Sequence, residues 1–366
     1  MVARKLSILI SFALILCLCC CAKTNTQDDE THTNLPAFQD HRDTDDVGIM
    51  INAYQKPFDE GYEYEVIGTD GVSLFYSKKK PKPMGTTLIE SFIVSIPRES
   101  AVETILLDTS YEGLYYVNEE IVTTEGIFWS LYDASGCCIQ FYDFNNQDII
   151  QIKHIPEAKN IVLNADNRFL IWVEWEIVDD EESPYLLGKL YTFDVLTKEV
   201  KMVSDKVYSI SPYARFPVNG GKCAFSTIDQ DSKKICRYDL DLMNVTDSFE
   251  VEIQDPANIM TANDRIIFSN GILDGLKPLD IYIYDCSSGE MIKVHSITED
   301  HNIFSFHLIG DNLVINDDHI ETDNATASLI FRKLDQLTDY EAVSIPEGYF
   351  VFGKVIDGHY YIVEDL

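Results

Sequence analysis

One motif recurs along most of this chain: an apolar segment that ends in an aromatic residue followed by an aspartate. Its aspartates are Asp143, Asp194, Asp239, Asp285 and, in a worn copy, Asp335. Successive aspartates are 51, 45, 46 and 50 residues apart. Degenerate copies lie at Phe92–Pro97 and, one further period upstream, at Ile49–Tyr54. Self-similarity at such a period is typical of a fold assembled from repeated supersecondary units.

The segments between these motifs have the pattern of short β-strands. Runs of Ile, Val, Tyr, Phe and Thr, such as Val72–Tyr76, Arg168–Val173 and Ile281–Tyr284, alternate with Asp, Asn, Gly and Ser turns. Evenly spaced strands of this kind predict an all-β sandwich, barrel or propeller. Because a repeat of about 45–50 residues corresponds to one four-stranded blade, we predict a β-propeller. After each third strand, the aspartate carboxylate should accept backbone N–H groups in an Asx turn.

The two ends of the repeat region look like complementary parts of one blade. Tyr349–Lys354 and His359–Val363 resemble its first two strands, and residues 49–54 and 62–67 resemble its last two. Joined in one sheet, the N- and C-terminal strands would close the ring and give seven blades. Six blades is the main alternative, because residues 62–78 can also open a complete first blade. A β-solenoid or two sandwiches are the alternatives to a propeller.

The first 21 residues have the features of an export signal. Arg4 and Lys5 precede an apolar run from Leu6 to Leu18, which is 13 residues long. A transmembrane helix needs about 20 such residues, whereas the core of a signal peptide is shorter. The run ends in Leu18-Cys19-Cys20-Cys21 before a polar segment. We therefore predict a signal peptide over residues 1–21, a flexible polar tether over residues 22–46 and a propeller domain over residues 47–366.

Two resemblances to known proteins follow from these residues. The end of the apolar run resembles the lipobox of bacterial lipoproteins, which implies acylation of Cys21. Acylation of Cys20 or Cys19, or an ordinary signal peptide, are the alternatives. The repeat of aromatic-Asp, turn and Gly-Glu or Lys-Glu resembles the TolB-like propellers found in many bacterial lipoproteins. Together the resemblances imply a body that scaffolds or binds, anchored by lipid to the outer face of a bacterial membrane.

The net charge limits the partners of this chain. The formal charge is −33 at pH 7. Such a surface repels the phosphates of nucleic acid, which basic proteins bind through counterion release. It also repels anionic headgroups, so we expect contact with the membrane through the lipid anchor only. The charge is suited to attract Ca²⁺ or a cationic partner, and the alternative is that it serves solubility alone.

Aromatic and acidic residues gather around one predicted loop between a second and a third strand. The candidate ligand-binding residues are Trp172, Trp175, Asp179, Asp180 and Tyr185. Loops at this position lie on the usual ligand face of a propeller. Aromatic rings beside carboxylates can stack on a sugar or hold a cationic group. The alternative is that both tryptophans pack between blades and the acidic residues form a solvated loop tip.

Motifs of catalysis and cofactor binding are missing from the sequence. It contains no GxSxG, HExxH, P-loop or GxGxxG pattern, so we expect no catalytic residues, no cofactor and no metal site. With 61 acidic residues, close carboxylate pairs arise by chance and carry no information. Our leading interpretation is a non-enzymatic binding or scaffold module for an extracytoplasmic protein, peptide or glycan. The alternatives are a carbohydrate hydrolase or lyase with carboxylates at the channel mouth, and a structural subunit of an envelope complex.

Cys223 and Cys236 are predicted to be neighbours in one hairpin. Lys222–Thr227 and Lys234–Asp239 have the pattern of antiparallel strands joined by residues 228–233. If Thr227 faces Ser232, the two cysteines lie directly opposite each other, with Cβ atoms about 4.5–5.5 Å apart. An exported protein can form a disulfide at such a place. The alternative is two free thiols that pack as small apolar residues.

Overall fold

The computed structural model describes residues 43–44, 49–55, 59, 61–69, 72–80, 88–97, 102–112, 116–133, 135–157, 161–178, 185–229, 232–252, 256–271, 279–297, 301–309, 312–319, 327–333, 341–344, 349–356 and 359–364. All of them belong to one compact unit, residues 37–366. The predicted signal peptide, Cys21 and residues 22–42 lie outside the described residues, as do Asp179, Asp180 and Asp335. The described residues form strands and turns, with no helix among them.

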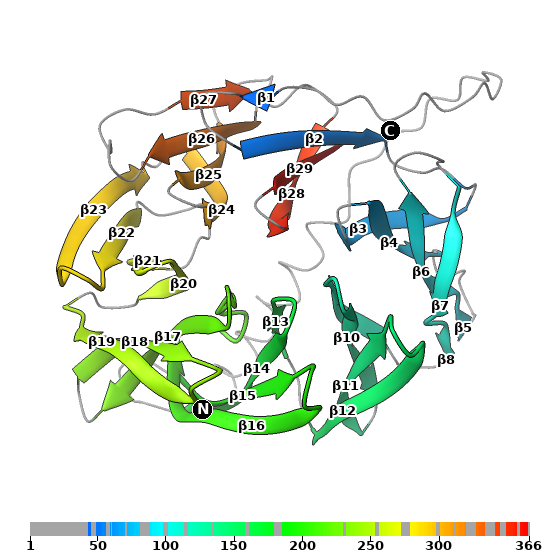
Figure 1. Cartoon of the computed structure of the whole chain (residues 1–366), viewed down its shortest axis with the longest axis horizontal. Coiled ribbons are helices and arrows are strands. Elements are labelled where there is room, and N and C mark those ends of the chain that lie inside the picture. Colours follow the sequence, from blue (N-terminus) through cyan, green and yellow to red (C-terminus); the bar gives the residue numbers. More distant parts are fainter. Residues whose placement is uncertain are drawn as a thin grey trace, which may run out of the picture. The chain divides into compact units, whose positions relative to one another are not determined.

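Small antiparallel sheets make up most of this unit (Figure 1). One sheet consists of β3 (Glu63–Thr69), β4 (Ser73–Lys79), β6 (Ser91–Pro97) and β7 (Thr104–Asp108). The next consists of β9 (Tyr116–Val122), β10 (Gly126–Asp133), β11 (Gly136–Asp143) and β12 (Asp148–Pro156). A third consists of β20 (Ala257–Ala262), β21 (Arg265–Ser269), β22 (Leu279–Asp285) and β23 (Glu290–Ile297). A fourth consists of β24 (His301–Ile309), β25 (Asn312–His319), β26 (Ala327–Lys333) and β27 (Glu341–Ser344). β5 (Leu88–Ile89) and β8 (Tyr111–Glu112) form a separate pair.

The longest sheet consists of two parts. The first part is β13 (Leu163–Ala165), β14 (Phe169–Val178), β15 (Tyr185–Asp194) and β16 (Glu199–Ser209). The second is β17 (Lys222–Asp229), β18 (Ser232–Asp239) and β19 (Asn244–Glu250). Among the described residues, one pair, Val207 with Thr227, joins β16 to β17. The segment 210–218 leads into β17 without being a strand and buries Phe216 in the core.

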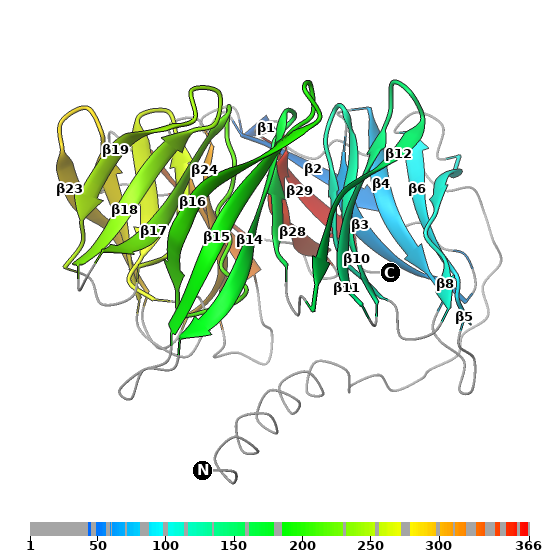
Figure 2. The ribbon, with the colours of Figure 1, turned by 90° about the horizontal axis from the view of Figure 1, so that it is seen from below.

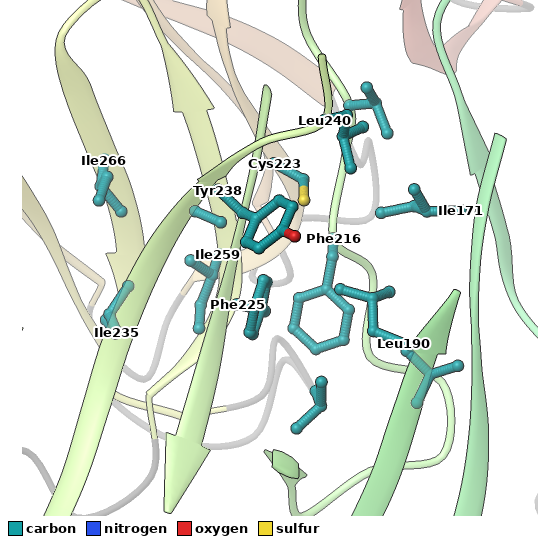
Figure 3. Close-up of a cluster of buried hydrophobic side chains, with 14 of the residues drawn as sticks. Ile171, Leu190, Phe216, Cys223, Phe225, Ile235, Tyr238, Leu240, Ile259 and Ile266 are labelled. Atoms are coloured by element: carbon teal, nitrogen blue, oxygen red, sulfur yellow. The ribbon is translucent and has the colours of Figure 1, made fainter. Parts of the chain in front are cut away.

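The sheets stand side by side, and the first strands of neighbouring sheets contact one another (Figure 2). These contacts join β3 to β9, β9 to β13, β17 to β20 and β20 to β24. Apolar side chains fill the space between sheets; Figure 3 shows one such core, with Ile171 and Leu190 from one sheet, Phe225 from the next part and Ile259 and Ile266 from another. Because a sheet in this position is covered on both faces, its inner strands are nearly continuous apolar runs.

The two ends of the unit share one sheet. β28 (Tyr349–Ile356) pairs with β29 (His359–Glu364), and β29 pairs in parallel with β2 (Ile49–Gln55), from Ile51 with Tyr360 to Gln55 with Glu364. β1 (Asp43–Thr44), which falls within the range predicted as tether, pairs with the start of β2. The prediction that residues 62–67 also belong to this sheet is wrong. Residues 63–67 lie in β3, because β3 pairs along its length with β4 and packs Tyr64 and Val66 against Leu74.

The expected aspartate turns are confirmed wherever the motif lies in the described residues. Each aspartate is the last residue of its strand and accepts a backbone N–H two or three residues later. The bonds are Asn145 to Asp143 at 2.9 Å, Leu196 to Asp194 at 2.8 Å, Leu242 to Asp239 at 2.9 Å and Ser287 to Asp285 at 2.9 Å. The fourth residue after each aspartate adopts a positive φ; these residues are Gln147, Lys198, Met243 and Gly289. This left-handed residue closes the turn before the outer strand begins.

The aromatic residue of the motif has a cross-strand partner within the same repeat. It pairs across the ladder with an aliphatic residue six positions after the aspartate. The pairs are Tyr142 with Ile149, Phe193 with Val200, Tyr238 with Val245 and Tyr284 with Met291. Aromatic and aliphatic side chains directly opposite each other stabilise a sheet by about 0.2–1 kcal/mol per pair. The repeat in the sequence therefore reflects one local structure, which consists of the aspartate turn and the cross-strand pair beside it.

The cysteine hairpin forms, but in a register two residues away from the predicted one. Cys223 pairs with Tyr238, and Cys236 with Phe225. The predicted register is wrong because Asp229 pairs with Ser232, which leaves only residues 230 and 231 for the connection. The two cysteines lie diagonally on one face of the hairpin, and both are free thiols. Figure 3 shows Cys223 in the buried cluster beside Tyr238.

Candidate functional site

Two consecutive glutamates, Glu119 and Glu120, lie at the centre of strand β9. This strand is the first of its sheet and contacts β3. Its pairing with β10 is irregular, because Glu120 pairs with Trp129 and Val117 with Leu131. The N–H of Glu119 donates a hydrogen bond to Ser130 Oγ at 3.2 Å. A bulge of this kind re-aims side chains, and here it accompanies two carboxylates that reach different neighbours.

Glu120 holds its carboxylate between β9 and β4. Ser77 Oγ donates a hydrogen bond to Glu120 Oε1 at 3.1 Å, and Lys79 Nζ lies 3.6 Å from Oε2. The Glu120 side chain is 5% exposed. Burial raises the pKa of Glu120 above its ordinary value; Lys79 and Ser77 oppose this shift, and the charge of Glu65 adds to it. A buried carboxylate with a perturbed pKa on an inner strand is a candidate functional group.

Glu119 reaches a different sheet. Its Oε1 accepts a hydrogen bond from Arg215 Nη2 at 3.1 Å, and Arg215 comes from the segment that leads into β17. The Glu119 side chain is 13% exposed, whereas that of Arg215 is 50% exposed. The strands of the first part of the long sheet stand between these two residues in the sequence. This ion pair therefore links the first strand of one sheet to the entry of another.

Together these residues form what we call the β9 carboxylate site, defined as Glu65, Ser77, Lys79, Glu119, Glu120 and Arg215. Glu65 adds an exposed carboxylate from β3. Carboxylates held on neighbouring first strands bind cationic groups, and Arg215 is one such group already in place. In the part of the chain that the structure describes, no group of His, Cys, Asp and Glu is arranged to hold a metal ion.

We expect Glu120→Gln to stabilise the protein at neutral pH. The raised pKa means that the folded state favours the protonated carboxyl group. The stability that the protonated Glu120 carboxyl group contributes is fully present below the unfolded pKa of about 4.3. It is lost as the pH rises through the folded pKa, so ionisation of Glu120 opposes folding at pH 7. The amide keeps the shape without the charge, and the gain should be about 1 kcal/mol at pH 7. It should vanish near pH 4 in urea unfolding curves. A loss of stability at pH 7 would instead make Glu120 part of a structural ion pair.

A second buried charge, Lys78, is occupied by groups of the chain itself. Its Nζ lies 2.8 Å from Asp59 Oδ2 and 2.7 Å from Glu103 Oε1. The rings of Tyr62 and Tyr64 have their centroids 4.7 and 5.3 Å away from the same nitrogen. Burial raises the pKa of Tyr64 to about 12. Since two carboxylates and two rings of the chain already surround the ammonium group, we interpret this cluster as structural.

The structure places the two tryptophans of the predicted ligand-binding set in different clusters. Trp172 is 1% exposed and stacks on Tyr191, with ring centroids 5.6 Å apart. Trp175 lies on the other face of β14, in the cluster that contains Phe216. An odd spacing along a strand puts side chains on opposite faces, and here the two faces pack on different sheets. Tyr185 is partly buried, with its ring 5.7 Å from that of Tyr208. Asp179 and Asp180 lie outside the described residues.

The sequence does hold a signal for the β9 carboxylate site. Glu119 and Glu120 are adjacent charges that follow Val117-Asn118 and precede the apolar pair Ile121-Val122. Two charges at the centre of a strand that also contains Val117, Ile121 and Val122 break the expected pattern, and such a break marks a place where function overrides folding. The abundance of acidic residues hid this signal.

Comparisons with known proteins support the fold. No family model matches the chain, and no curated protein matches its sequence. Among solved structures, the chain is similar to an acylaminoacyl peptidase of Pyrococcus horikoshii, with 11% identity and a TM-score of 0.51 over 80% of this chain and 47% of the peptidase. It is similar to a prolyl endopeptidase with 10% identity and a TM-score of 0.50, over 80% of this chain and 52% of that one.

TolB from Acinetobacter baumannii is also similar, with 13% identity and a TM-score of 0.42, over 78% of this chain and 79% of TolB. The chain spans about half of the length of the two peptidases. At such identities the likeness concerns the fold alone, which is all-β with four-stranded antiparallel sheets of the propeller type. In the described part of the chain, no helix has the length and apolar character to cross a membrane.

Proposed function

We propose that this protein is a lipid-anchored propeller of seven blades that binds a partner on the outer face of a bacterial membrane. The count of seven blades treats the two parts of the long sheet as separate blades and includes the sheet that the two ends of the chain share. Two observations support closure of the ring: β28 contacts both β24 and β3, and β2 pairs with β29. The export signal and the lipobox resemblance support an anchor at Cys21, with a tether between anchor and body.

The proposed role is binding of an extracytoplasmic protein, peptide or glycan at the β9 carboxylate site. The observation that carries this proposal is the Glu119 carboxylate on a first strand, which accepts a hydrogen bond at 3.1 Å from the half-exposed guanidinium group of Arg215. A carboxylate that already pairs with a solvent-exposed cationic group can also pair with the cationic group of a partner.

The second candidate is a carbohydrate hydrolase or lyase. It is favoured by the raised pKa of Glu120, a property of general acids. Two observations weigh against it: the Glu120 side chain is 5% exposed, and Ser77, which hydrogen-bonds it, is 1% exposed. Groups so enclosed do not reach a glycosidic bond.

Photo-crosslinking in native membranes tests the binding function. A photoreactive amino acid in place of the exposed Glu65 should capture one discrete partner, and Glu119→Gln should reduce the capture at least tenfold. Cys21→Ser should remove the fatty-acid label, release the chain from the membrane fraction and abolish capture there. Release of sugar products from a polysaccharide, lost in Glu120→Gln, would establish the enzymatic alternative instead.

A further inference from the structure

We propose that the Glu119 carboxylate is a receptor for a guanidinium group, that Arg215 is its resident occupant, and that an arginine side chain of a partner protein or peptide displaces it. This inference rests on the proposed binding function and names the class of partner. It also assigns Arg215 a regulatory role, because the site is closed while Arg215 occupies it.

The exposed fractions of the Glu119 and Arg215 side chains indicate that Arg215 can be replaced by a cation from solution. Glu119 is 13% exposed, so its carboxylate is held mostly within the protein. Arg215 is 50% exposed, so its guanidinium group approaches from the solvent side. An ion pair with one exposed member contributes only about 0–1 kcal/mol. A competing cation from solution can therefore replace Arg215 at little cost.

The backbone around Arg215 allows this exchange without a change of fold. Phe216, the next residue, is 3% exposed and fixes the segment in the core. On the other side, the Ser211 N–H donates to Ser209 Oγ at 3.0 Å, and the Tyr213 N–H donates to Ser211 Oγ at 3.2 Å. Because the segment is held on both sides, only the Arg215 side chain has to rotate away.

The surroundings of Glu119 select a guanidinium group. The Ser130 contact fixes the bulge from which the Glu119 side chain extends. The occupant seen in the structure is itself a guanidinium group, 3.1 Å from the carboxylate. A guanidinium group is planar, carries five donors in a fixed fork and is more weakly hydrated than an ammonium group.

Calorimetric titration of the full mature chain tests the inference. The probe is N-acetyl-Gly-Arg-Gly amide, compared with the same peptide carrying citrulline, which has the same shape without the charge, and with the lysine peptide. Arg215→Gln should tighten binding of the arginine peptide about fivefold, since it removes the internal competitor. Glu119→Gln should abolish binding in both backgrounds, and the citrulline peptide should not bind. The matched control is Lys201→Gln, which removes an equally exposed charge from β16 and should leave the affinity unchanged.

Three results would overturn the inference: unchanged or weaker binding in Arg215→Gln, equal binding of the citrulline peptide, or binding that survives Glu119→Gln. Arg215→Lys serves as a second variant, and its affinity should fall between wild type and Arg215→Gln. The proposed function fails separately, if the photoreactive residue at position 65 captures no partner. Capture that depends on Glu119 without any binding of the arginine peptide would keep the function and refute the guanidinium class.

Discussion

Deletion of residues 43–55 is expected to abolish cooperative unfolding and to cause aggregation. These residues form β1 and β2, which complete the sheet of β28 and β29. Without β2, the edge of β29 from Tyr360 to Glu364 loses its hydrogen-bond partners. An isolated two-stranded hairpin is marginal in water, and an open strand edge pairs with other chains. Since β28 contacts both β3 and β24, destabilising the sheet of β28 and β29 also weakens the two neighbouring sheets.

Differential scanning calorimetry and light scattering measure this effect. The matched control is deletion of residues 22–42, which shortens the predicted tether and keeps β1 and β2. This control should melt like the full mature chain, in one transition at the same temperature. Extending the first deletion to residue 67 would also remove most of β3 and damage a second sheet. A variant without residues 43–55 that melts like the full chain would show that β2 is not needed for the stability of this sheet.

Gly126→Ala is expected to destabilise the protein by about 3 kcal/mol. Gly126 begins β10 and pairs with Asp143, the aspartate of the repeated turn. A Cβ atom at this position would collide with the carbonyl oxygen of Tyr142 and would lie 2.6 Å from the ring atom Cε2 of Phe141. Neither neighbour moves easily, because one is backbone in a ladder and the other is a fully buried ring.

Gly271→Ala is the matched control for this substitution. A Cβ at Gly271 would meet the Cδ2 atom of Leu279 at 2.8 Å, which is the end of a flexible side chain. The cost should stay below about 1 kcal/mol, because the leucine can change rotamer. Urea unfolding of both variants at pH 7 measures the difference. Equal losses in the two variants would show that backbone proximity at Gly126 is not the cause.

The candidate site was the harder part to anticipate from the sequence. The predicted ligand-binding residues combine tryptophans with a run of acidic residues, but the periodicity of β14 directs Trp172 and Trp175 to different cores. The β9 carboxylate site draws on β3, β4, β9 and the segment before β17. Glu119 and Arg215 are 96 residues apart in sequence, and no local pattern relates them. Only the stacking of sheets brings them within reach of each other.

The sequence by itself determined the strand-and-turn unit of this protein. The aspartate, its backbone donors, the left-handed residue and the pair of Phe193 with Val200 all lie within a few residues, so local geometry is enough to specify them.

The tertiary structure decided which segments share a sheet. The parallel pair of β2 with β29 joins residues about 310 positions apart. The register of the hairpin that contains Cys223 and Cys236 depends on where the chain turns. The predicted and the observed register both satisfy the same alternating pattern of apolar residues. A two-residue shift keeps every side chain on its face, so the apolar pattern cannot distinguish the registers, and the short connection between Asp229 and Ser232 selects one.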